Sequence, residues 1–144
     1  MLLLLEDEVE RLERFTAVMR SLAPEMSIRV WRDAHAMIDE AGPLLTSAAL
    51  LSLDHDLFPE PGGPDPGDGY MVAQWLTTQS AVKPVIIHSS NGERSTWMAG
   101  AFDLAGWKHW RVAPLGDDWI ESDWRRLVRR LLNRQGKSEP KDRS

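Results

Sequence analysis

The sequence predicts an α/β fold in three layers: a doubly wound, five-stranded parallel sheet with helices on both faces. Short apolar segments alternate five times with segments of helical periodicity along the 144 residues. Such alternation is typical of parallel strands joined by right-handed crossovers. Several apolar segments end directly in acidic or polar residues, which places these side chains at the carboxyl edge of the sheet, where ligands bind in such folds.

The length and composition indicate one globular domain. A hydrophobic share of 42% is ordinary for such a domain, and the absence of cysteine excludes disulfides and thiolate metal sites. The net charge of -5 gives no general attraction to nucleic acid. The apolar residues 2–5 are too few for a signal peptide, and no apolar stretch is long enough to span a bilayer. We therefore expect a cytoplasmic protein without a membrane partner.

The first half of the sequence supplies three strands and two helices. Residues 1–5 form an apolar run typical of a strand buried on both faces. Apolar residues then recur at helical spacing from Val9 to Leu22, and Pro24 ends this helix. A short strand is expected over residues 27–31, a helix capped by Asp33 up to about Glu40, and a strand over residues 49–53.

The second half begins with a loop rich in proline and glycine over residues 58–69. The elements expected after it are a helix over 70–77, a strand over 84–88, a helix over 94–104 and a strand over 110–112. In the last helix, five apolar residues form one stripe between a capping Ser122 and a stop at Gly136. We therefore place the domain over residues 1–135 and a disordered polar tail over 136–144.

Acidic residues follow two of the predicted strands. Glu6 and Asp7 come after the first strand, and Asp54 comes after the third, with Asp56 close behind. Carboxylates packed together repel and raise one another's pKa, and a hard divalent cation such as Mg²⁺ relieves this repulsion. The alternative is that each acid merely caps the helix that follows it.

Two histidines lie close to these acids in the predicted fold. Side chains alternate along a strand, so Asp54 and Asp56 share one side and His55 faces the other. His88 ends the next strand. Each histidine is either a hydrogen-bonded structural residue or a general acid or base acting on a phosphate ester.

Hydrogen-bond donors follow His88 directly. Ser89, Ser90 and the amide of Asn91 offer donors to phosphate oxygens, and Arg94 adds a bidentate donor at a helix start. Arg94 is otherwise an ordinary solvated arginine. The loop over residues 58–69 is either a lid over this edge or a long connection, in which Asp65 and Asp68 form turns. The arginines on the outer face of the last helix are either solvated or a patch for a phosphate backbone.

Several segments resemble the receiver domain of response regulators, a flavodoxin-like fold. Leu2-Leu3-Leu4-Leu5-Glu6-Asp7-Glu8 resembles its opening, and Leu51-Ser52-Leu53-Asp54 stands where receivers carry their phospho-accepting aspartate. Asp68-Gly69-Tyr70 is similar to the start of its third helix, and Pro84-Val85-Ile86-Ile87-His88-Ser89 to its fourth strand. Ala113-Pro114 departs from the family, because receivers have a lysine before this proline that pairs with the phosphoryl group.

Two motifs resemble a more specific family, the receiver-derived cyclic-phosphate processing proteins. These motifs are Ser52-Leu53-Asp54-His55-Asp56-Leu57 and Ile87-His88-Ser89-Ser90-Asn91. The resemblance implies a metal-dependent phosphoesterase, a hydrolase acting on a cyclic phosphate of a nucleotide or an RNA end. The roles expected are Mg²⁺ or Mn²⁺ binding by Glu6, Asp7, Asp54 and Asp56, catalysis by His55, His88 and Asp54, and phosphate binding by Ser89, Asn91 and Arg94.

Two other functions stay open. A divergent receiver would accept a phosphoryl group on Asp54 from a histidine kinase. A pseudo-receiver would have no activity and would bind a protein partner through its last two helices.

Overall fold

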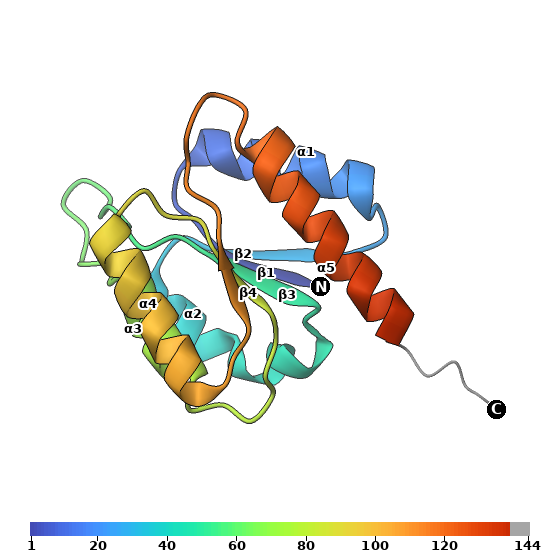
Figure 1. The fold of residues 1–144 in the computed structure, drawn as a ribbon. Helices are drawn as coiled ribbons and strands as arrows, with labels where there is room; N and C mark the ends of the chain where they lie inside the picture. Colours follow the sequence, from blue (N-terminus) through green and yellow to red (C-terminus); the bar gives the residue numbers. More distant parts are fainter. Residues whose placement is uncertain (139–144) are drawn as a thin grey trace.

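The computed structural model describes residues 1–138 and contains a five-stranded parallel sheet in the order β2-β1-β3-β4-β5 (Figure 1). The expected fold class is confirmed. The strands are β1 (Leu2–Leu5), β2 (Ile28–Trp31), β3 (Leu50–Leu53), β4 (Val85–Ile87) and β5 (His109–Arg111).

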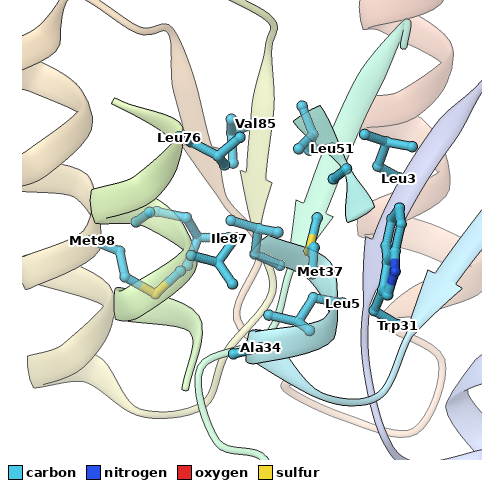
Figure 2. Close-up of a cluster of buried hydrophobic side chains, with 14 of the residues drawn as sticks. Leu3, Leu5, Trp31, Ala34, Met37, Leu51, Leu76, Val85, Ile87 and Met98 are labelled. Atoms are coloured by element: carbon cyan, nitrogen blue, oxygen red, sulfur yellow. The ribbon is translucent and has the colours of Figure 1, made fainter. Parts of the chain in front are cut away.

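Helices cover both faces of the sheet, and alternate residues of each inner strand pack against opposite layers (Figure 1). Leu3 and Leu5 belong to the core beneath α2 (Ala34–Glu40), α3 (Gly69–Leu76) and α4 (Gly92–Ala105), part of which Figure 2 shows. Leu2 and Leu4 pack on the other side, against α1 (Val9–Leu22) and α5 (Arg125–Ser138). None of the helices within residues 1–138 has the length and apolar character needed to cross a bilayer.

Helix ends differ most from the expectations. A 3-10 helix over Gly42–Ser47 follows α2, where the sequence predicted no element. Asn91, predicted to bind phosphate, caps α4 by accepting a hydrogen bond from the backbone N–H of Arg94. α4 therefore begins two residues earlier than its apolar pattern predicts.

Both predicted ends of the last helix are also wrong. A π-helical turn over Ile120–Trp124 leads into α5, and Ser122 lies within this turn instead of capping the helix. α5 then continues through Gly136 to Ser138, because a glycine weakens a helix without ending it. The remainder of the predicted tail, residues 139–144, lies outside the described residues.

The register of the sheet fixes where the site forms. Leu5 of β1 is paired with Leu53 of β3, and Leu53 with Ile87 of β4. The ladder continues one residue further, since Asp54 N–H donates to the carbonyl of Leu5 and His88 N–H to that of Leu53, at 3.0 and 2.9 Å. The residues that directly follow the three strands are therefore neighbours.

Gly69 keeps the segment after β3 close to the start of α3. Its N–H donates to the carbonyl of His55 at 3.0 Å, and a Cβ on Gly69 would overlap the carbonyl oxygen of Asp54. We expect Gly69→Ala to lower the free energy of unfolding by about 1–3 kcal/mol, because backbone on both sides must shift. Chemical denaturation measures this loss.

Gly100 of α4 provides the matched control, because a Cβ there meets no atom within 4 Å. Gly100→Ala should stabilise the protein by up to about 1 kcal/mol through helix propensity. Equal effects of the two substitutions would contradict the close approach at Gly69.

Candidate active site

Three polar side chains meet at the carboxyl edge of the sheet. Glu6, Asp54 and His88 follow strand residues Leu4, Ser52 and Ile86 by two positions, so they project to the same face, toward α1 and α5. Each offers a ligand atom within 4.8 Å of the others, and all three residues are buried. The convergence predicted from the sequence is therefore present.

His88 is the centre of a buried hydrogen-bond chain. Its Nε2 lies 3.0 Å from Glu6 Oε1, and its Nδ1 lies 2.7 Å from Ser52 Oγ. Trp124 Nε1–H donates to the same hydroxyl at 3.0 Å. An ionised Glu6 can only accept, so Nε2 carries the hydrogen, while Nδ1 shares a hydrogen bond with the Ser52 hydroxyl. Both ring nitrogens are thus used within the protein, and neither is free to bind a metal or a substrate.

Glu6 is held in its ionised form. Oε2 accepts from the backbone N–H groups of Asp7 and Glu8 at 3.1 and 3.0 Å, while Oε1 faces His88. Burial opposes ionisation, but the hydrogen bond and charge of His88, the Glu8 N–H and nearby Arg11 outweigh it, so the pKa of Glu6 is lowered. Glu6 is a fixed negative charge beneath the site.

Asp54 is in the opposite situation. Burial, together with repulsion from Glu6, raises its pKa to about 6, although His88, the N–H of His55 and Arg11 favour the charged form. Its Oδ1 accepts from the His55 N–H at 2.7 Å, and its Oδ2 lies 3.7 Å from Arg11. The carboxyl group is therefore ionised at neutral pH, although its burial and the nearby charge of Glu6 make the ionised form unfavourable.

An open pocket of about 250 Å³ lies over these groups, and acidic side chains dominate its wall. Its lining residues are Asp7, Glu8, Arg11, Asp54, Asp56, Phe58 and Ser90. Asp54 and Asp56 share the pocket and His55 does not, as strand alternation predicts. Asp7 accepts a hydrogen bond from the Phe58 N–H at 2.7 Å, which ties the loop after β3 to the pocket rim.

His55 is buried beside the pocket and not in its lining. Its Nδ1 lies 2.7 Å from Asp56 Oδ1 and donates to this carboxylate. Nε2 has no hydrogen-bond partner in residues 1–138 and lies 3.7 Å from Asp68 Oδ2. Asp68 itself caps α3 through Met71 N–H, and Asp65 accepts from Gly67 N–H, so both acids shape turns as expected.

The residues predicted to bind phosphate, Ser89, Asn91 and Arg94, do not line the pocket. Ser89 is fully buried and its hydroxyl accepts from the Asn91 N–H at 3.1 Å. The Asn91 amide donates to Asp56 at 3.4 Å. Arg94 stacks its guanidinium on Trp97, 3.8 Å from the ring centroid, and is not among the pocket-lining residues. The neighbouring Ser90 does line the pocket.

Sequence reasoning missed Arg11 of α1. Its Nη1 lies 3.7 Å from both Glu6 and Asp54, and its guanidinium lies 5.2 Å from the ring centroid of Trp119. A signal was present, since Arg11 precedes buried Phe15 by four residues on the helix face that packs on the sheet. Val9, which had been assigned to that stripe, is 55% exposed.

The family model described as the cyclic-phosphate processing receiver domain matches residues 1–103 of this chain. The chain belongs to this family. The matched range contains Glu6, Arg11, Asp54 and His88, so the acidic pocket is part of the shared domain.

Solved receiver structures share the fold of this cyclic-phosphate processing receiver domain. The receiver domain from Rhodospirillum rubrum has a TM-score of 0.69 and 17% identity, covering 92% of this chain and 93% of that chain. A chain of the CheX–CheY–BeF3–Mg²⁺ complex from Borrelia burgdorferi has a TM-score of 0.63 and 17% identity, covering 88% of this chain and 86% of that chain. The Mn²⁺-bound form of response regulator Rcp1 has a TM-score of 0.61 and 15% identity, covering 90% of this chain and 89% of that chain. No match is found among curated proteins.

Away from its acidic pocket, this receiver domain carries a basic surface on α5. Arg126, Arg129, Arg130 and Arg134 line a shallow hollow of about 400 Å³ together with Asn133. Arg126 is paired with Asp123 at 3.2 Å on the exposed outer face of the helix. Arg126, Arg129 and Arg130 are therefore exposed on the outer face of the last helix, as predicted.

Proposed function

We propose that this protein is a metal-dependent phosphoesterase that hydrolyses a cyclic phosphate of a nucleotide or an RNA end. The observation that carries the proposal is the acidic pocket over Glu6, Asp54 and His88, in a member of the cyclic-phosphate processing family. Hydrolysis adds water to phosphorus and breaks one of the two ester bonds of the ring, leaving a monoester and a hydroxyl group.

The pocket suits a hard divalent cation, Mg²⁺ or Mn²⁺. Asp7, Asp54 and Asp56 line the same pocket, and the pKa of Asp54 is raised mainly by burial and further by repulsion from Glu6, both of which a bound cation would offset. Both oxygens of Glu6 already accept hydrogen bonds, so Glu6 contributes charge from below. When bound, the cation polarises a phosphoryl oxygen. The Mn²⁺-bound structure of Rcp1 supports this choice by fold analogy.

The two histidines take different roles in this proposal. His88 positions Glu6, because its ring nitrogens are occupied and its side chain is inaccessible. His55 is the candidate proton acceptor for the attacking water, since Asp56 orients its ring through Nδ1 and Nε2 has no hydrogen-bond partner within residues 1–138. Nε2 is buried, so this role requires the loop between Asp56 and Asp68 to move.

Turnover of a panel of 2′,3′-cyclic nucleotides with Mg²⁺ or Mn²⁺ tests the proposal. We expect metal-dependent ring opening by the wild type, detected as the phosphomonoester, and none by Asp54→Asn. Arg126→Gln on the remote face of α5 should keep full turnover. An absence of turnover by folded wild type across the panel would refute the phosphoesterase.

A second candidate is a divergent receiver that is phosphorylated on Asp54. It is favoured by the position of Asp54, whose carboxylate follows β3 and lines the pocket. Incubation with acetyl phosphate and Mg²⁺ should then add one phosphoryl group, visible by mass spectrometry and absent in Asp54→Asn.

A pseudo-receiver would show neither labelling nor turnover. The exposed Trp97 and Leu104 of α4 are its candidate contact to a protein partner.

A further inference from the structure

Arg11 is the single cation among the described residues that line the acidic pocket. It projects from the first turns of α1, and its side chain is 20% exposed. Nη1 lies equally far, 3.7 Å, from Glu6 Oε1 and from Asp54 Oδ2, while Nε lies 3.4 Å from Glu8. The face of Trp119 supports the guanidinium from the side. The group is therefore held in place over the buried charges.

These contacts leave the hydrogen-bonding capacity of Arg11 unused. Within residues 1–138, its ion-pair distances exceed those of direct charge-assisted hydrogen bonds, and it makes no hydrogen bond. Arg14, one turn later, shows the contrast, since its guanidinium is hydrogen-bonded to Glu10, Glu121 and the Asp117 carbonyl. Arg11 thus lines the pocket with N–H donors that make no hydrogen bond to another side chain of residues 1–138.

Other cations in this region are directed elsewhere. Arg32 donates to the Asp7 carbonyl at 2.9 Å and pairs with Glu60, and Arg94 stacks on Trp97. Ala113, after β5, carries no charge. An anion that entered the acidic pocket would therefore meet positive charge from Arg11.

We propose that Arg11 is the residue that binds the phosphate group in this pocket, and that without phosphate it is the counter-ion of Glu6 and Asp54. The choice of phosphate rests on the proposed function. A guanidinium binds two phosphate oxygens through paired N–H groups, which a carboxylate-lined pocket otherwise lacks. The same charge opposes a divalent cation on Asp54, so Arg11 favours the anion and disfavours the metal.

This dual effect gives an experiment with two opposite readouts. Calorimetric titrations would measure Mn²⁺ binding, and then inorganic phosphate binding at saturating Mn²⁺, for wild type, Arg11→Gln and Arg11→Lys. We expect Arg11→Gln to weaken phosphate binding roughly 10- to 100-fold and to tighten Mn²⁺ binding roughly threefold or more. Arg11→Lys, which keeps the charge but not the planar fork, should lie between.

Arg14→Gln is the matched control, because it removes the same charge from the same helix at nearly equal exposure, 22% against 20%. It should leave phosphate binding within about twofold of wild type, since Arg14 does not line the pocket. Thermal unfolding of each variant checks that it is folded. A variant whose only effect is to disorder the site would weaken the binding of both phosphate and Mn²⁺.

Phosphate affinity that is unchanged in Arg11→Gln, or lost equally in Arg14→Gln, would overturn the assignment, as would wild type that binds no phosphate with Mn²⁺. These outcomes are independent of turnover. Phosphate binding that depends on Arg11 in a protein inactive on every cyclic nucleotide would support Arg11 as the phosphate ligand while removing the phosphoesterase.

Discussion

Replacing His88 by alanine should lower the free energy of unfolding by about 3–5 kcal/mol, because it leaves the Glu6 carboxylate buried without its partner. His88 is fully buried and also packs on Phe15, with ring centroids 5.0 Å apart. The substitution opens a cavity in addition to removing the hydrogen bond from Nε2–H. Urea denaturation followed by tryptophan fluorescence measures the loss.

The charge of Glu6 can be separated from the cavity by a second substitution. In the His88→Ala background, Glu6→Gln should restore part of the stability, since residue 6 then carries no buried charge that lacks its partner. His88→Gln should also cost less than His88→Ala, because its amide still offers a donor to Glu6. If Glu6→Gln instead added a further loss to His88→Ala, Glu6 and His88 would not form the coupled pair described here.

Ser52 and Trp124 explain why the sequence did not reveal this role of His88. The order and type of strands follow from apolar runs, and period-two alternation places Glu6, Asp54 and His88 on one face. The bonding of a histidine, however, depends on what the opposite layer supplies. Trp124 comes from a π-helical turn that no periodicity predicts, and it fixes the Ser52 hydroxyl through a contact 72 residues away.

Arg11 and Arg94 show a related limit for the pocket. Both are arginines near helix starts, and the sequence favoured Arg94 because it follows a run of polar donors. In the structure Arg94 stacks on the neighbouring Trp97 at the surface of α4. Arg11 instead lies over the pocket, where it contacts Trp119 and two buried acids. A long side chain can reach several partners, so its direction depends on tertiary contacts rather than on its position in the sequence.

The two buried acids have opposite effects on stability. Glu6 has a lowered pKa, so it stabilises the fold above its ordinary pKa of 4.5, and this contribution is lost as pH falls through its folded value. Asp54 has a raised pKa, so its ionisation opposes folding. Only Glu6 has a full set of hydrogen bonds; Asp54 keeps one oxygen toward the pocket.

Asp54→Asn should therefore make the metal-free protein more stable at pH 7–8 while removing divalent-cation binding. The difference between a pKa of about 6 and the ordinary 3.8 corresponds to roughly 3 kcal/mol above pH 6. Asparagine keeps an oxygen for the His55 N–H, whose bond to Asp54 is 2.7 Å. We expect a net gain of about 1–3 kcal/mol, since the contact with Arg11 is lost.

The pH dependence gives the sign of this effect independently of the substitution. Between pH 4 and 6 the folded protein retains the Asp54 proton that the unfolded chain has released, so this group lowers stability progressively as pH rises across that window and no further above it. The stability difference between Asp54→Asn and wild type should therefore grow from pH 4 to 6 and then stay level. Saturating Mn²⁺ should reverse the order, because only wild type gains from binding the ion. A difference that is flat with pH, or a variant less stable than wild type at pH 8 without metal, would mean that burial and the charge of Glu6 do not raise the pKa of Asp54, and would remove this argument for the proposed cation site.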